Sequence, residues 1–167
     1  MLKLVFYGND FLRQESKDIE NFDENIASLA TEMLNSLERF NGVGLAAVQV
    51  GYHYNMFVTD TREKNERLIF INPVIIETSA DSVPYNEGCL SLPNLYKDIM
   101  RPSRVVINAQ DVTGKRFTLE AKGLLARVIQ HEYDHLKGKV FIDHLSDNDK
   151  KKAEQELARL MKKKVKK

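Results

Sequence analysis

The sequence contains no tryptophan, four prolines and a single cysteine among its 167 residues. One cysteine, Cys89, excludes an internal disulfide and is typical of a protein from a reducing compartment. No apolar run approaches the roughly 20 residues that span a bilayer. Gly8-Asn9-Asp10 interrupts the apolar start of the chain too early for a signal peptide. We therefore expect a cytoplasmic protein that has no membrane partner.

The chain has the length of one ordinary domain, and it contains neither internal repeats nor a proline-rich linker. Its composition, with 43% hydrophobic and 29% charged residues, is that of a globular protein. A chain of this length can bury a sizeable core without disulfides or a structural metal. We therefore expect one catalytic domain over residues 1–167, in which any bound metal is free to take part in catalysis.

The net charge of +1 hides an uneven distribution of charged residues. Residues 150–167 contain eight lysines, Arg159 and two glutamates, a charge of +7 that leaves −6 for residues 1–149. A basic tail on an acidic body is compatible with contact to a polyanion such as RNA, and equally with a solvated, lysine-rich helix end. We expect no DNA partner.

Runs of β-branched and aromatic residues indicate strands in both halves of the sequence. The expected strands are residues 2–7, 54–59, 68–71, 104–109 and 116–119. Because the intervening residues 111–115 (D-V-T-G-K) have the composition of a turn, the last two strands should pair as an antiparallel hairpin.

Apolar residues that recur every three or four positions predict three amphipathic helices. The first occupies residues 23–41, with Asp23 as its cap and Gly42 as its stop, and the second runs from about residue 121 to 136. The third begins at Ser146 and carries the basic tail, at about 146–167. These elements predict an α+β fold, in which antiparallel β-sheets surround a central helix and further helices lie toward the N-terminus and the C-terminus.

The segment His131-Glu132-Tyr133-Asp134-His135 places two histidines four residues apart, with a glutamate beside the first. A helix turns once every 3.6 residues, so both imidazoles face one side, where they can share a metal ion. Both histidines continue the apolar stripe of the central helix and should point inward. The alternative is a solvated helix that happens to carry two histidines. We expect the central helix to bind metal.

A catalytic metal site needs a third protein ligand and an open position for water. Cys89, in the segment E-G-C-L-S, is a candidate because ligands of one site commonly come from different elements. A buried spectator thiol is the alternative. A thiolate beside two imidazoles suits zinc or ferrous iron.

Residues 42–49 (G-V-G-L-A-A-V-Q) directly follow the first helix. Their glycines permit close approach of a ligand, and Gln49 supplies an amide in an otherwise apolar stretch. A plain turn from helix to strand would explain the glycines equally well. The segment lacks the lysine and the spacing of a phosphate-binding loop, so nucleotide binding is not expected.

Taken together and in this order, the segments G-x-G-L-A-A-x-Q, E-G-C-L-S and H-E-x-x-H resemble peptide deformylase, with matching segments over residues 42–144. The resemblance implies a hydrolase that removes the N-formyl group from the formylmethionine of nascent bacterial polypeptides and releases formate. It also implies one divalent metal ion per chain, expected to be Fe2+ in the cell and replaceable by Zn2+, Ni2+ or Co2+.

Carried onto this sequence, the resemblance implies a role for each motif residue. Glu132 would take a proton from a water molecule in the fourth metal position and deliver one to the departing amine. The charge on the formyl oxygen would be met by the metal, the side-chain amide of Gln49 and the backbone N–H of Leu90. The metal ligands would be Cys89, His131 and His135.

The methionine side chain needs an apolar slot, and the expected lining comes from Val43, Tyr85, Leu124 and Val128. Core packing uses the same residue types, so that interpretation stays open. Backbone groups of Val43, Gly44 and Gly88 are candidates to pair with an extended peptide.

The resemblance implies an ion pair between Glu87 and Arg101, as the matching positions form in the family. Exposed ion pairs contribute little, so this pair matters only if it is buried near the metal. Arg127, one residue before the pocket face, should point to solvent or to the peptide entrance. Residues 11–19 lack prolines often found in the family. Tyr96 stands where some members carry a basic residue, so the preference for later peptide residues stays open.

Two other functions compete with this interpretation. A zinc endopeptidase would use the same H-E-x-x-H with a downstream ligand, for which Asp143 and His144 are the candidates. An inactive RNA- or ribosome-binding module would depend on the lysine-rich tail, although the intact ligand set and Glu132 argue against inactivity. In the resembling family a C-terminal helix can dock on the ribosome, so residues 146–167 are a candidate ribosome contact here.

Overall fold

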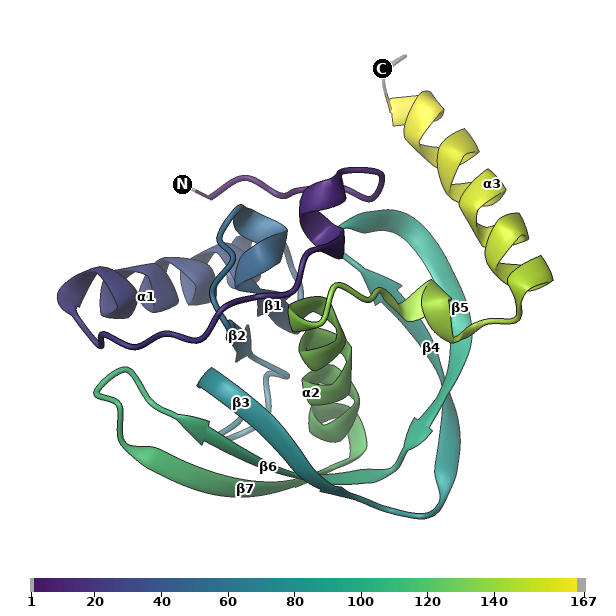
Figure 1. Cartoon of the computed structure of the whole chain (residues 1–167). Coiled ribbons are helices and arrows are strands. Elements are labelled where there is room, and N and C mark those ends of the chain that lie inside the picture. The colour runs from purple at the N-terminus through teal and green to yellow at the C-terminus, as the bar shows by residue number, and fades with distance from the viewer. Residues whose placement is uncertain (1, 165–167) are drawn as a thin grey trace.

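Two antiparallel sheets enclose one helix in the computed structural model of the chain, which describes residues 2–164 (Figure 1). The larger sheet has the strand order β1-β2-β3-β6-β7, and β4 and β5 form a separate two-stranded sheet. The strands are β1 (Gly44–Ala46), β2 (Met56–Thr59), β3 (Leu68–Thr78), β4 (Ser82–Cys89), β5 (Leu92–Pro102), β6 (Arg104–Gln110) and β7 (Arg116–Lys122). Together with the helices of the chain, this arrangement confirms the expected α+β class.

The central helix is α2 (Gly123–Leu136), which lies between the two sheets (Figure 1). One face of α2 presents Leu125, Ala126 and Ile129 to the larger sheet. The sheet residues in the same apolar cluster include Phe57, Phe70, Val105 and Ile107. Because full burial of a large apolar side chain stabilises a fold by about 1.5–3 kcal/mol, this face holds the helix firmly on the sheet.

The first helix, α1 (Glu24–Arg39), begins as predicted. Asp23 Oδ1 accepts hydrogen bonds from the first free backbone N–H groups of the helix, at 3.0 and 3.1 Å. The left-handed residue that follows the helix is Asn41, with φ 53°, and not Gly42. Glycine is required at position 42 by close packing instead, because a Cβ there would lie 2.8 Å from the Leu37 side chain and 2.9 Å from that of Leu90.

The last helix, α3 (Asp147–Lys164), begins after Ser146, whose hydroxyl accepts a backbone N–H of the first turn at 3.2 Å. It lies along β5 (Figure 1) and contributes Ala153 and Leu157 to an apolar cluster with Leu95 and Ile99. Residues 165–167 of the expected basic tail lie outside the described residues. Within residues 2–164, no helix combines the length and the apolar composition that crossing a bilayer requires.

Four of the five expected strands correspond to β2, β3, β6 and β7, and the antiparallel pairing of β6 with β7 is confirmed. The strand expected at residues 2–7 is wrong. That segment is extended but joins neither sheet: Val5 N–H donates to Gln49 O at 2.8 Å, and Tyr7 N–H donates to Ser91 O at 2.9 Å. The β4–β5 hairpin was not predicted, because proline, glycine and acidic residues in these strands mask a strand pattern.

Candidate metal centre and active site

Two elements bring the three expected ligands together. Cys89 ends β4, and His131 and His135 lie one turn apart on α2. The Cys89 Sγ atom and the ring nitrogens all lie within 4.8 Å of one another, and Sγ is 3.3 Å from His135 Nε2. Among residues 2–164, no other group of three such side chains is arranged to share an ion. One thiolate and two imidazoles suit Zn2+ or Fe2+, so the side chains fit a divalent metal ion.

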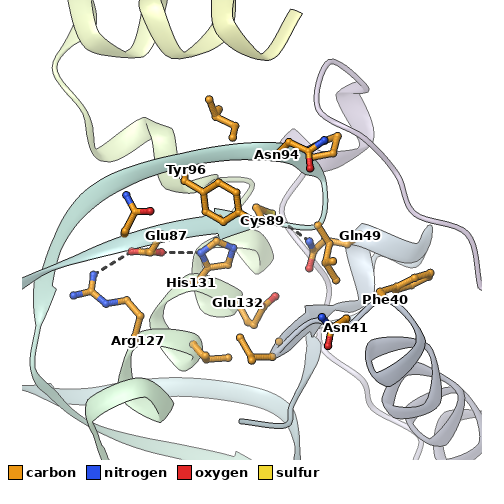
Figure 2. Close-up of a pocket in the computed structure, with 18 of the residues that line it drawn as sticks. Phe40, Asn41, Gln49, Glu87, Cys89, Asn94, Tyr96, Arg127, His131 and Glu132 are labelled. Atoms are coloured by element: carbon orange, nitrogen blue, oxygen red, sulfur yellow. Dashed lines mark hydrogen bonds and ion pairs between the residues drawn. The ribbon is translucent and has the colours of Figure 1, made fainter. Parts of the chain in front are cut away.

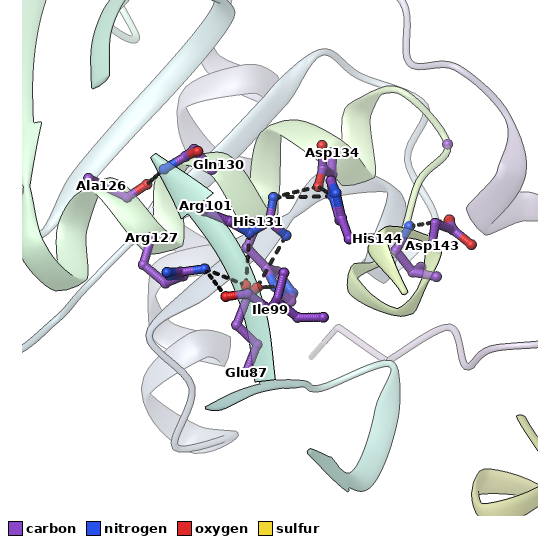
Figure 3. A network of polar contacts seen from close by, with 12 residues as sticks. Glu87, Ile99, Arg101, Ala126, Arg127, Gln130, His131, Asp134, Asp143 and His144 are labelled. Carbon is purple, nitrogen blue, oxygen red and sulfur yellow. Dashed lines mark hydrogen bonds and ion pairs between the residues drawn. The ribbon is translucent and has the colours of Figure 1, made fainter. Parts of the chain in front are cut away.

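Glu87 in β4 orients the first histidine (Figure 3). Its Oε1 atom lies 2.8 Å from His131 Nδ1, which leaves the other ring nitrogen for a metal. A carboxylate in this position is a common partner of a metal-binding histidine. Burial would raise the pKa of Glu87, but hydrogen bonds with His131 and Arg101 outweigh it and lower this pKa to about 2. Glu87 is therefore a charged carboxylate at neutral pH.

The expected ion pair between Glu87 and Arg101 is confirmed, and it is buried, with side chains only 3% and 4% exposed. Arg101 Nε donates to Glu87 Oε2 at 2.8 Å, and Arg101 Nη1 donates to Asp134 Oδ2 at 2.8 Å. The pair thus lies directly behind His131 and belongs to the support of the metal centre.

Arg127 was expected to point to solvent or to the peptide entrance. The solvent alternative is wrong, whereas Arg127 does line the cavity that opens onto this centre. The residue is 5% exposed, and its Nη1 atom donates to Glu87 Oε2 at 3.0 Å (Figure 2). The same guanidinium also donates to the backbone carbonyls of Val83 and Ile99, at 2.7 and 2.9 Å. Arg127 therefore joins α2 to both strands of the β4–β5 hairpin, a contact between distant segments that no local pattern in the sequence reveals.

The two histidines differ in their protonation. Burial lowers the pKa of His135 well below its ordinary value, so this ring is neutral, the form that binds a metal. Burial would also lower the pKa of His131, but the neighbouring Cys89 and Glu87 outweigh it and raise this pKa. The proton on the metal-facing nitrogen of His131 must therefore leave when a cation binds.

Glu132 lies next to the ligands, and its Oε2 atom is buried without a hydrogen-bond partner among the described residues. Burial raises the pKa of Glu132 to about 7. A Cβ on Gly44 would collide with Glu132 Oε1 and lie 2.6 Å from Val128 Cγ1. Glycine at position 44 therefore keeps the space beside this carboxylate open.

Gln49 lies in a short 3₁₀ helix, Ala47–Val50, directly after β1. Its side-chain oxygen accepts the backbone N–H of Ala46 at 2.8 Å. Its amide nitrogen donates to Ser91 Oγ at 3.1 Å and lies 3.5 Å from Cys89 Sγ. The donor end of the amide is therefore held beside the proposed metal ligands.

A cavity of about 530 Å³ opens onto this centre (Figure 2). Its lining includes Gln49, Cys89, Leu90, His131 and Glu132, whereas His135 is fully buried behind them. All of the expected peptide contacts line it as well: Val43, Gly44, Tyr85, Gly88, Leu124 and Val128. No pattern in the sequence indicated Phe6, which borders the cavity because the N-terminal segment runs past Gln49 and Ser91.

The two candidate ligands of an endopeptidase have other partners. Asp143 pairs with Arg13 at 2.5 Å and with Lys150 at 2.7 Å, and His144 Nε2 lies 2.7 Å from Asp134 Oδ2. Neither belongs to the group of side chains that can share an ion. The hypothesis that Asp143 or His144 completes the site is therefore not favoured.

Comparison with known proteins agrees with this geometry. The chain matches the family model described as polypeptide deformylase over residues 1–151. It is 49% identical over 151 residues to the peptide deformylase of Borreliella burgdorferi, which covers 90% of this chain and 92% of that protein. It is 41% identical over 148 residues to peptide deformylase 1B, chloroplastic, of Oryza sativa subsp. japonica, covering 87% of this chain but only 55% of the longer plant protein.

The fold agrees as well. The crystal structure of a peptide deformylase from Legionella pneumophila superposes with a TM-score of 0.93 at 34% identity, covering 100% of this chain and 99% of that one. These matches do not favour an endopeptidase or an inactive binding module. The chain therefore belongs to the polypeptide deformylase family, metal-dependent hydrolases that remove the N-formyl group from nascent polypeptides.

Proposed function

We propose that this deformylase holds one divalent metal ion with Cys89, His131 and His135, and that the ion in the cell is Fe2+, replaceable by Zn2+, Ni2+ or Co2+. The mixed sulfur and nitrogen donor set supports this choice. When bound, the ion would polarise the formyl group and make a water molecule more acidic. Purification without oxygen, followed by elemental analysis and an activity assay on the same sample, tests the identity of the ion.

Glu132 is the proposed proton carrier. Its buried, unpartnered Oε2 atom supports this role, because a buried polar atom requires a partner that the protein does not supply here. Glu132 accepts a proton from the water that attacks the formyl carbon. It then delivers a proton to the amine nitrogen as the formamide C–N bond breaks, and the products are formate and the free N-terminus.

Gln49 and Leu90 are the proposed donors to the formyl oxygen, on which negative charge develops during the attack. The fixed amide of Gln49 supports this role, because its nitrogen lies 3.5 Å from Cys89 Sγ and both residues line the cavity. The backbone N–H of Leu90 follows directly after the cysteine ligand. Each well-placed donor of this kind contributes roughly 2.7–4 kcal/mol to stabilisation of the transition state.

The cavity is the proposed peptide site. Val43, Leu124 and Val128 offer an apolar surface for the methionine side chain, with Tyr85 at 48% exposure near the opening. The strand β1 is at the edge of the larger sheet, so Val43 and Gly44 have one side on which an extended peptide can pair. Gly88 is proposed as the backbone partner on the opposite hairpin.

The outward face of α3 is a proposed ribosome contact, and the enzyme is proposed to act in the cytoplasm, where its nascent substrates are made. Both glutamates of the basic tail have partners in the rest of the protein: Glu154 accepts from Tyr7 at 2.6 Å, and Glu156 pairs with Lys97 at 2.5 Å. The other exposed charged side chains of residues 150–162 are all basic: Lys151, Lys152, Arg159 and Lys162.

Charge reversal is a sharper test of this contact than deletion of α3, because deletion would also uncover the apolar cluster on β5. Changing Lys151, Lys152 and Lys162 to glutamate should weaken sedimentation with ribosomes and reduce its salt dependence. Unchanged binding and salt dependence would contradict the proposal. Lys115→Glu, in the β6–β7 turn, is the control for a single charge reversal away from α3, and each of the three lysines is also changed singly for comparison with it.

The central test is formate release from formyl-Met-Ala-Ser, measured beside cleavage of internal bonds in an unformylated peptide. A deformylase releases formate and leaves the internal bonds intact, whereas an endopeptidase does the reverse. The single observation that carries the assignment of the site is the convergence of the three ligand atoms beside Glu132.

A further inference from the structure

Arg62 has a backbone conformation that its residue type rarely takes. Its φ is 70°, in the left-handed region that favours glycine. Among the described residues, every other non-glycine position with positive φ is an asparagine, a residue that tolerates this region well. A long charged side chain in such a conformation indicates a contact that the conformation makes possible.

The guanidinium of Arg62 is fixed on a buried carboxylate. Arg62 Nη1 lies 2.8 Å from Asp60 Oδ2, and the backbone N–H of Arg62 donates to Asp60 Oδ1 at 3.0 Å. Asp60 is 7% exposed and also pairs with Arg67 at 2.6 Å. Burial would raise the pKa of Asp60, but hydrogen bonds from Arg67 and Arg62 outweigh it and lower this pKa. The carboxylate is therefore charged. Arg62 therefore has a defined position despite an exposed fraction of 44%.

The same guanidinium also contacts the segment before β1. Arg62 Nη2 donates to the backbone carbonyl of Gly42 at 3.1 Å. The strand β2 ends at Thr59, which lies opposite Gly44, and Asp60 N–H still donates to Val43 O at 2.9 Å. For Gly42 no further residue of β2 is available. The Arg62 side chain thus extends the hydrogen bonding between β2 and the β1 segment by one carbonyl group, that of Gly42.

We propose that Arg62 is a positioning residue for the peptide: it fixes the Gly42 carbonyl and thereby the Val43–Gly44 backbone with which the formylated chain pairs. This inference rests on the proposed function of that backbone. Arg62 and Gly42 do not line the cavity, so Arg62 acts through the strand rather than on the peptide itself. Gly42 also packs closely against Leu90, so the same contact supports a second part of the proposed site.

The test is Arg62→Asn, which keeps a residue tolerant of positive φ and removes the guanidinium. For formyl-Met-Ala-Ser we expect KM to rise about fivefold to tenfold, within the range for one lost hydrogen bond of ordinary strength, while kcat changes less than about twofold. Formyl-methionine amide lacks the later backbone groups, so its KM should change less than about twofold. The thermal midpoint should stay within about 2 °C of the wild type.

Two variants complete the design. Asn65→Gly changes an exposed residue of the same loop, with φ 66°, and should leave both KM values unchanged. Arg62→Lys keeps the charge but loses the planar guanidinium, which can donate to Asp60 and Gly42 at the same time. Its KM for the longer peptide should lie between those of the wild type and Arg62→Asn.

Three results would overturn the inference while leaving the proposed function intact: a wild-type KM for the longer peptide in Arg62→Asn, an equal rise for both substrates, or the same rise in Asn65→Gly. A wild-type protein that releases no formate from either substrate would overturn the proposed function as well.

Discussion

The two faces of α2 are both buried, but they are stabilised in different ways. On the sheet side, removal of Leu125, Ala126 and Ile129 from water stabilises the fold. This stabilisation depends little on the relative orientation of the side chains. On the hairpin side, Arg127 and His131 are stabilised only if each polar atom meets a donor or an acceptor. The first face should therefore tolerate small changes, whereas the second should not.

The largest effect is expected at Glu132, beside the hairpin face. Glu132→Ala should lower the rate of formate release by about 100-fold to 10,000-fold, because the proton carrier is lost. The metal content should stay the same, since none of the three proposed ligands changes. Formate assays and elemental analysis on one preparation check both statements, and Glu132→Gln is the isosteric control. Wild-type turnover in either variant would contradict the role.

The next effect concerns stability. Glu87→Ala removes the carboxylate between two buried guanidinium groups, Arg101 and Arg127, and should lower the free energy of unfolding by about 3–5 kcal/mol. Denaturant unfolding measures this. The matched control is Glu77→Ala, which breaks a pair of the 58% exposed Glu77 with Arg104 and should cost no more than about 1 kcal/mol. Equal losses would remove the distinction between buried and exposed pairs.

The apolar face should respond more weakly. Ile129→Val removes one methylene group from the cluster on the sheet and should cost about 0.5–1.5 kcal/mol. Turnover should remain that of the wild type, because Ile129 belongs to the apolar cluster on the sheet and is not among the residues that line the cavity. Unfolding curves and formate assays on the same variant check this. A loss of turnover at unchanged stability would mean that the two faces are coupled.

The smallest effect should come from the polar cluster at the surface around Asp143. Burial would raise the pKa of Asp143, but hydrogen bonds from Arg13 and Lys150 outweigh it and lower this pKa to about 2. A lowered pKa gives stability that is present above the unfolded-state value and is lost as the pH falls toward 2. The thermal midpoint of Asp143→Asn should therefore fall less steeply than that of the wild type between pH 4 and pH 2, about the range set by the unfolded and folded pKa values.

Parallel curves for the two proteins would show that Asp143 contributes nothing to the acid sensitivity. Asp147→Asn, at the start of α3, is a suitable control because it changes the same charge without the contacts to Arg13.

The sequence predicted those parts of the site that depend on local spacing. The helical step between His131 and His135, and the cap at Asp23, follow from 3.6 residues per turn and from backbone donors that need acceptors. The sequence did not predict the β4–β5 hairpin, because proline, glycine and acidic residues interrupt the residues that favour strands. Nor did it predict the contact of Arg127 with Glu87, because a buried ion pair between distant segments leaves no periodic pattern.

One bond described above links the two ends of the chain. Tyr7 donates to Glu154, 147 positions later, so the segment that carries Phe6 along the cavity is tied to the last helix. During translation this tie forms only after nearly the whole protein has been made. In the finished protein, fraying of α3 should also loosen the N-terminal segment, so amide exchange in these two regions should rise together rather than separately.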